Sequence, residues 1–115
     1  MGQEFIKRRL KLVSEYDDMF KKFVAALVEK VPGSTVILIG SRAKGDARPS
    51  SDFDIVLVTT TPPGWGLLAS LYQLAGELPV DIIPASPADL QTPLFRQMLK
   101  GCKTLHDGLG ISPCP

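Results

Sequence analysis

The chain has 115 residues, of which 44% are hydrophobic and 22% are charged, and its net charge is +1. That length supports one domain with its own core but not a catalytic domain plus a separate substrate domain, so we expect a single domain over residues 1–115. The nearly neutral charge gives no overall attraction to nucleic acid or to an anionic membrane. Any specific function must therefore come from local motifs.

Two further absences narrow the class of protein. The sequence has no charged and then apolar leader, and no apolar run near the roughly 20 residues that a membrane span requires. We therefore expect a soluble, cytoplasmic protein that does not bind membranes. Cys102 and Cys114 lack the close spacing of a zinc knuckle and have no histidine cluster beside them. They are expected to be free thiols, although a disulfide between them is possible.

The first predicted element is a long amphipathic helix within residues 1–31. Its apolar residues recur at steps of three and four, with charged residues between them. They are Phe5, Ile6, Leu10, Val13, Phe20, Phe23, Val24, Leu27 and Val28. Pro32 and Gly33 should end the helix, because proline disfavours helical backbone in the preceding residue and glycine permits the turn.

The same helix contains the best candidate patch for binding nucleic acid. Lys7, Arg8, Arg9 and Lys11 form a basic run near the N-terminus. A basic run on an amphipathic helix is explained more simply as its solvated face. Direct binding of nucleic acid is therefore not expected.

Strands and helices then alternate along the chain. The β-branched run 35–39 predicts a strand covered on both faces, and 53–60 predicts a second strand. A helix is expected over 66–78 and a short strand over 80–83. Another helix is expected over 90–99, with Ser86 as its N-cap and Pro87 in its first turn, followed by a strand at 103–106. Residues 107–115 are expected to be a loose tail.

Three acidic residues lie at or near the predicted strands. Asp52 and Asp54 are two residues apart, so on a strand they project from one face with Cα atoms roughly 7 Å apart. Asp81 lies in the next strand among apolar residues, and we expect it to be buried beside a compensating cation. Every candidate ligand is an oxygen, which favours magnesium. Two magnesium ions held here could activate an attacking oxygen and stabilise a leaving pyrophosphate.

A turn that suits phosphate precedes these acids. Gly40 lets the backbone turn sharply, and Ser41 should open a short helix and contact phosphate. Arg42 and Lys44 are further candidates for contacts to a triphosphate, although both side chains could instead point to solvent. Each of these features alone is common in ordinary turns. Their combination with the three acids predicts a nucleotide and metal site.

The motif resembles that of a known family. Gly40 and Ser41, ten intervening residues, and then Asp52 and Asp54 resemble the minimal nucleotidyltransferases of the DNA polymerase beta-like superfamily. The resemblance implies a small mixed-sheet α/β domain that binds a nucleoside triphosphate with magnesium, transfers the nucleoside monophosphate and releases pyrophosphate. It also implies that Asp52, Asp54 and Asp81 are metal ligands, with Asp81 placed to activate the acceptor hydroxyl.

The resemblance extends to a partner. Small relatives of this kind are often paired with a HEPN-domain protein, as the antitoxin that adds AMP from ATP to the toxin. It therefore implies a protein acceptor and a homo- or hetero-oligomer. Two alternatives remain open: an antitoxin that acts by steric binding alone, and a catalytic subunit that modifies a small molecule such as an aminoglycoside, with another chain supplying the pocket.

Overall fold

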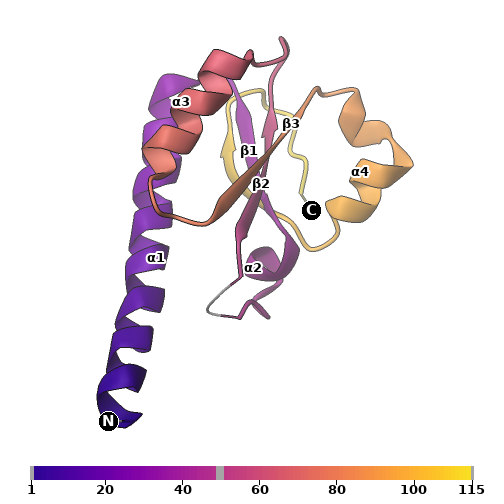
Figure 1. Cartoon of the computed structure of the whole chain (residues 1–115). Coiled ribbons are helices and arrows are strands. Elements are labelled where there is room, and N and C mark those ends of the chain that lie inside the picture. Colours follow the sequence, from indigo (N-terminus) through magenta and orange to yellow (C-terminus); the bar gives the residue numbers. More distant parts are fainter. Residues whose placement is uncertain (1, 49–50, 115) are drawn as a thin grey trace.

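A four-stranded mixed sheet forms the centre of the computed structural model, which describes residues 2–48 and 51–114, with side chains from residue 15 onward (Figure 1). Along the chain its elements are α1 (Gly2–Lys30), β1 (Thr35–Ile39), α2 (Gly40–Lys44), β2 (Phe53–Val58), α3 (Trp65–Ala75), β3 (Val80–Ala85), the 3-10 helix η1 (Asp89–Gln91), α4 (Pro93–Met98) and β4 (Lys103–Asp107). The predicted α/β class is confirmed. The basic run at residues 7–11 lies outside the described side chains.

The strand order is β3-β2-β1-β4. β1 is antiparallel to both β2 and β4, whereas β2 and β3 are parallel. β1 and β2 are therefore the central strands, and their β-branched, apolar residues are buried, as the sequence predicts. The end of β1 meets the start of β2, because Ile39 pairs with Asp54.

One face of the sheet packs on α1 and α3, which lie side by side in Figure 1. Phe20, Phe23 and Leu27 of α1 and Leu71 of α3 are buried against alternate strand residues. Each such side chain contributes roughly 1.5–3 kcal/mol of transfer free energy to folding. The long first helix is confirmed over Gly2–Lys30, whereas α3 ends at Ala75, three residues earlier than expected, because Gly76 takes a positive φ of 60°.

The opposite face of the sheet packs on the segment around α4. The buried residues of this second core are Ile37, Ile39, Val56, Val58, Ala85, Leu90 and Cys102.

The prediction of one helix over 90–99 is wrong, because the segment divides into η1 and α4. Thr92 precedes Pro93 and is extended, with ψ 152°, and its hydroxyl accepts the Phe95 N–H at 3.4 Å. Proline disfavours helical backbone at the residue before it, so the helix can only begin at Pro93.

The C-terminal residues are fastened to the sheet. Cys102 and Cys114 form a disulfide, so the expectation of free thiols is wrong; their Cα atoms lie 5.8 Å apart, within the usual bridging range. The Asp107 carboxylate accepts the N–H groups of Ile111 and Ser112, each at 3.0 Å, and the Thr35 hydroxyl at 2.9 Å. Residues 108–114 are therefore held by covalent and hydrogen bonds rather than loose.

No helix in the described part of the chain combines the length and the apolar character needed to cross a bilayer.

Replacing Asp107 with Ala is expected to release this segment, because two backbone N–H groups and the Thr35 hydroxyl lose their acceptor. Amide hydrogen exchange, followed by NMR, should show loss of protection at Ile111 and Ser112 while the amides of β2 stay protected. Glu77→Ala, at an exposed acid in a turn, serves as the control. Unchanged protection at Ile111 in Asp107→Ala would contradict this role.

Candidate active site

Three carboxylates gather at the edge of the sheet where β2 and β3 begin. The parallel register places Asp54 beside Asp81, and neighbouring strands lie about 4.8 Å apart. The pKa of the Asp54 carboxyl is raised above its ordinary value by partial burial, then by the negative charges of Asp81 and Asp52. Asp81 and Asp52 thus both lie near enough to Asp54 for their charges to act on it.

The turn after β1 runs directly against Asp54. Gly40 has a positive φ of 73°, and a Cβ built there would lie 3.1 Å from Asp54 Oδ2. A side chain at this position would be both strained and crowded, so glycine is needed for the backbone to approach the carboxylate. Gly40 also begins α2, as expected, and Ser41 follows it. Gly40 therefore lies at the Asp54 carboxylate, with Ser41 next to it in the chain.

The exposure of Asp81 differs from the sequence-based prediction. It was expected to be buried, but its side chain is exposed, as is that of Asp52, while Asp54 is half-buried. The physical reason is the strand order: β3 is an edge strand, so one side of it faces solvent. The apolar neighbours Ile82 and Ile83 pack on opposite faces of the sheet and do not enclose the carboxylate.

Tyr72 of α3 is a site neighbour that the sequence analysis did not assign. Its hydroxyl lies 3.4 Å from Asp81 Oδ1 and accepts the N–H of Ile82 at 3.0 Å. The only sequence signal is an aromatic residue one helical turn before the end of the helix that precedes β3. That spacing does not reveal which edge of the sheet the helix covers.

The arrangement of the acids bears on whether they could bind a metal ion together with a phosphate substrate. Among the described residues, no three acidic, histidine or cysteine side chains are grouped closely enough to enclose a metal ion. The three carboxylates offer only oxygen ligands, and partial burial together with the charges of Asp81 and Asp52 raises the pKa of Asp54. Magnesium is commonly bound by one or two carboxylates together with substrate phosphates rather than by a protein-only cage. The residues fit a magnesium site of that kind.

Arg42 has a different place from the one expected. Its guanidinium lies 4.1 Å from the centre of the Phe53 ring, and it donates to the Ser51 carbonyl at 2.9 Å and 3.3 Å. It also forms an ion pair of 3.8 Å with Asp17 of α1. Because Phe53 and Asp54 alternate along β2, these contacts hold Arg42 on the face of the sheet opposite to the carboxylates.

Lys44 is exposed at the end of α2, and its aliphatic stem runs beside Gly101, where a built Cβ would lie 3.1 Å from Lys44 Cγ. The structure thus places Lys44 at the surface between α2 and the start of β4, and it does not bring Lys44 together with the carboxylates.

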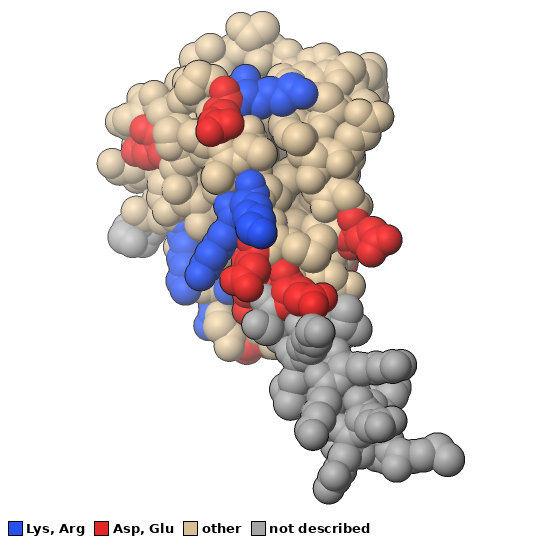
Figure 2. Space-filling model, turned by 90° about the vertical axis from the view of Figure 1, so that its left-hand side faces the viewer, with Lys and Arg blue, Asp and Glu red and all other residues tan. Residues whose placement is uncertain are grey.

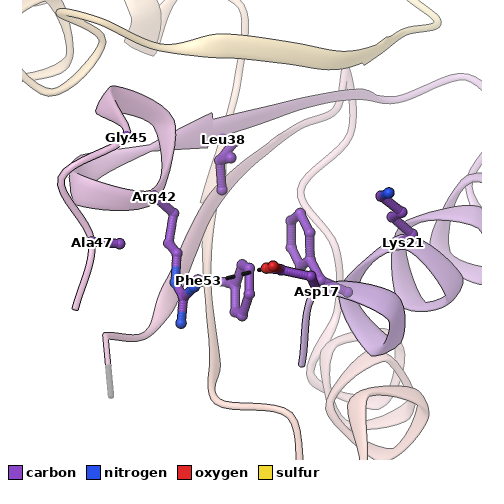
Figure 3. A pocket seen from close by; sticks show the side chains of 8 residues that line it. Asp17, Lys21, Leu38, Arg42, Gly45, Ala47 and Phe53 are labelled. Carbon is purple, nitrogen blue, oxygen red and sulfur yellow. Dashed lines mark ion pairs between the residues drawn. The ribbon is translucent and has the colours of Figure 1, made fainter. Parts of the chain in front are cut away.

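A hollow of about 410 Å³ lies beside Arg42, between α1 and α2 (Figure 3). Its floor contains Phe20 and Phe53, whose rings are stacked with centroids 4.3 Å apart, and its rim contains Asp17 and Lys21. We name it the α1–α2 hollow. It is separated from the carboxylates by the sheet, so it is not the site predicted from the motif.

Comparison with known proteins identifies the family of this chain. The family described as nucleotidyltransferase domain matches residues 20–106, which include β1, β2, β3, all but the last residue of β4, the Gly40 turn and the three acids. The chain belongs to the nucleotidyltransferase domain family. Membership assigns it to the transferases that move nucleotidyl groups. No curated protein is similar enough in sequence to add a named relative.

A solved structure supports the fold of this nucleotidyltransferase. The chain is similar to a nucleotidyltransferase candidate from Sulfolobus solfataricus, with a TM-score of 0.56 and 19% sequence identity over 84% of each chain. At that identity the likeness shows the shared fold.

Replacing Gly40 with Ala tests the approach of the turn to Asp54. Gly45→Ala is the matched control, because Gly45 also has a positive φ, 81°, but nothing lies within 4 Å of a Cβ there. Each substitution should lower the free energy of unfolding by about 1–2 kcal/mol through backbone strain. Gly40→Ala should lower it further, because its Cβ crowds Asp54; urea denaturation measures both. Equal losses would contradict the close contact.

The pH dependence of stability tests the charge cluster. The folded-state pKa of Asp54 lies above its ordinary value of 3.8, so the stability present at low pH is lost as the pH rises through the raised pKa. Asp54→Asn should therefore melt a few degrees higher than the original protein at neutral pH with a chelator present. The difference should shrink as the pH falls and vanish well below pH 3.8, where Asp54 is protonated in both the folded and the unfolded state. Calorimetry measures the effect, and a lower melting temperature of Asp54→Asn at neutral pH would contradict it.

Proposed function

We propose that this nucleotidyltransferase transfers AMP from ATP, with magnesium, to a hydroxyl group of a partner protein. The observation that carries the proposal is the pairing of Asp54 with Asp81 beside the Gly40 turn. A half-buried carboxylate with a raised pKa, next to two other acids, is unfavourable for folding alone. Such groups cluster at functional sites, where a ligand relieves the repulsion.

In the proposed reaction, different residues of the chain bind the phosphates and the metal. Gly40 and Ser41 would bring backbone and hydroxyl groups to the triphosphate, because glycine leaves room for a close approach. Asp52 and Asp54 would hold magnesium together with phosphate oxygens. When bound, magnesium supplies positive charge against the leaving pyrophosphate and orients the phosphates.

The transfer step is a displacement at the α-phosphorus. The acceptor hydroxyl oxygen forms a bond to that phosphorus, and the bond to the bridging oxygen of the β-phosphate breaks. Pyrophosphate leaves with the electron pair. Asp81 would take the hydroxyl proton, since its exposed carboxylate can be reached from solvent and its pairing with Asp54 keeps it near the phosphates.

The openness of the site favours a macromolecular acceptor. Asp52 and Asp81 are exposed at the beginning of two strands, one of them an edge strand. The α1–α2 hollow, which could enclose a small molecule, lies on the other face of the sheet. An acceptor that carries its own binding surface suits this geometry, and the family resemblance favours a HEPN-type toxin, with this chain acting as its antitoxin in the cytoplasm.

The test is incubation with α-labelled ATP, magnesium and the HEPN-type protein. Asp54→Asn should abolish labelling of the partner, and Asp81→Asn should reduce its rate by about 100-fold or more, as expected for loss of a general base. Glu77→Gln, at an exposed acid outside the site, should label at the original rate. Gel autoradiography and the increase in partner mass measure transfer.

Two outcomes would contradict the proposal. A partner that is never labelled but is still inhibited by Asp54→Asn would show that steric binding is the function. Label on an added aminoglycoside, with none on protein, would show that the acceptor is a small molecule.

A further inference from the structure

A hydroxyl group of the chain itself lies beside the carboxylates. The Tyr72 oxygen is 3.4 Å from Asp81 Oδ1 and 3.0 Å from the backbone nitrogen of Ile82. Asp81 is the acid that takes the proton of the acceptor hydroxyl in the proposed reaction. Before substrate binds, the hydrogen bond between a base and the group that it deprotonates is often long. The separation of Tyr72 from Asp81 therefore suits an acceptor and its base.

The two contacts of the Tyr72 oxygen determine where its proton points. The Ile82 N–H donates to that oxygen, so the hydroxyl proton is free to be donated to another group. The acceptor of this proton is the Asp81 carboxylate. The same Ile82 N–H can stabilise the negative charge that develops on the oxygen as the proton leaves. The hydroxyl thus has an adjacent base and an adjacent donor, which are the groups that activate an attacking oxygen.

The position of Tyr72 on α3 explains this placement. Leu71 and Ala75 are buried against the sheet, and Tyr72 lies about 100° around the helix from Leu71. Its side chain is therefore 42% exposed and reaches the edge of β3 instead of the core. α3 contains no charged residue, and the side of the molecule that α1 and α3 form is largely uncharged in its upper part (Figure 2). No cation of α3 competes with Tyr72 for the Asp81 carboxylate.

We propose that this nucleotidyltransferase also transfers AMP to its own Tyr72, within one copy of the chain. Self-transfer rests on the proposed use of ATP and magnesium, and it adds a tyrosine hydroxyl of the chain itself to the acceptors. The Tyr72 oxygen forms a bond to the α-phosphorus, and the bond from that phosphorus to the oxygen that bridges to the β-phosphate breaks. Pyrophosphate leaves with the electron pair, and the phenolic proton passes to Asp81.

The modification limits itself to one AMP per chain. The product is a phosphodiester at the position of the hydroxyl, so the Tyr72 oxygen has no further proton to give. Its negative charge lies beside Asp81 and is repelled by the acids, which disfavours binding of a second triphosphate. The modified tyrosine also occupies the approach to Asp81, so a protein acceptor and Tyr72 compete for the same base.

The mass of the purified chain after incubation with ATP and magnesium tests the proposal. The original protein should gain the mass of one AMP, and peptide mapping by mass spectrometry should place it on Tyr72. Tyr72→Phe should gain none. Tyr16→Phe is the matched control, because Tyr16 is the other tyrosine of the chain and packs partly buried against the core, and it should be labelled like the original. AMP on another residue, or none on the original protein, would overturn the proposal.

A mixture of two variants tests whether transfer occurs within one copy. Asp54→Asn keeps Tyr72 but loses a proposed magnesium ligand, whereas Tyr72→Phe keeps the three acids but lacks the acceptor. Neither variant should be labelled, alone or mixed, because the acids and the acceptor then lie in different copies. Circular dichroism checks that both are folded. Label on Asp54→Asn in the mixture would show transfer between copies and would overturn the arrangement proposed here.

Hydrogen exchange without ATP or magnesium tests the contact itself. Phenylalanine has no oxygen to accept the Ile82 N–H, so Tyr72→Phe should raise the exchange rate of this amide by about tenfold. Tyr16→Phe should leave the rate unchanged. An unchanged rate in Tyr72→Phe would overturn the proposal, because the hydroxyl would then not lie at the strand edge.

The identity of the labelled molecule distinguishes self-transfer from transfer to a partner. Label on the HEPN-type protein with none on Tyr72 would overturn self-transfer and leave the proposed function intact. Label on Tyr72 with none on the HEPN-type protein would support self-transfer and contradict that protein as the acceptor. Label on neither would overturn both proposals.

Discussion

The site depends on the register of one strand. β2 lies between β1 and β3, and its Asp54 pairs with Ile39 on one side and with Asp81 on the other. Because side chains alternate along a strand, this register sends Phe53 into the core under α1 and leaves Asp54 on the opposite face, beside the Gly40 turn. A slip by one residue would place the carboxylate in the aromatic core and the phenyl ring at the active edge, so the apolar core and the chemistry are specified by the same pairing.

One face of β2 stabilises the fold, whereas the face that carries the carboxylates opposes it. On one face, Phe53 stacks on Phe20 and lies under the Arg42 guanidinium, which in turn holds the Ser51 carbonyl. These contacts fix the chain just before Asp52. On the other face, the partial burial of Asp54 and the negative charges of Asp81 and Asp52 disfavour its ionised form and so oppose folding. The buried core thus keeps the carboxylates in an arrangement that they would not adopt by themselves, which is the usual condition for a preorganised site.

Much of this organisation could be predicted from the sequence, because it rests on local patterns. Apolar runs predicted the strands, and the spacing from Gly40 to Asp54 predicted that the turn and this acid lie close together. What could not be predicted depends on strand order and long-range contacts: the exposure of Asp81, the engagement of Arg42 with Asp17, and the disulfide between Cys102 and Cys114. The break before α4 was different, because Thr92 followed by Pro93 is a local signal that outweighs the apolar period around it.

The edge strand β3 has a consequence for how an acceptor reaches the enzyme. Its outward-facing N–H at Ile82 is already bonded to the Tyr72 hydroxyl, and two residues later Pro84 has no N–H to offer. An incoming polypeptide therefore finds few donors for backbone pairing along this edge. β-Augmentation, the common way in which an extended peptide docks on a sheet, is disfavoured beside the carboxylates. The protein acceptor proposed above would therefore present its hydroxyl from a loop or a helix. Accidental strand pairing between copies is suppressed by the same two residues.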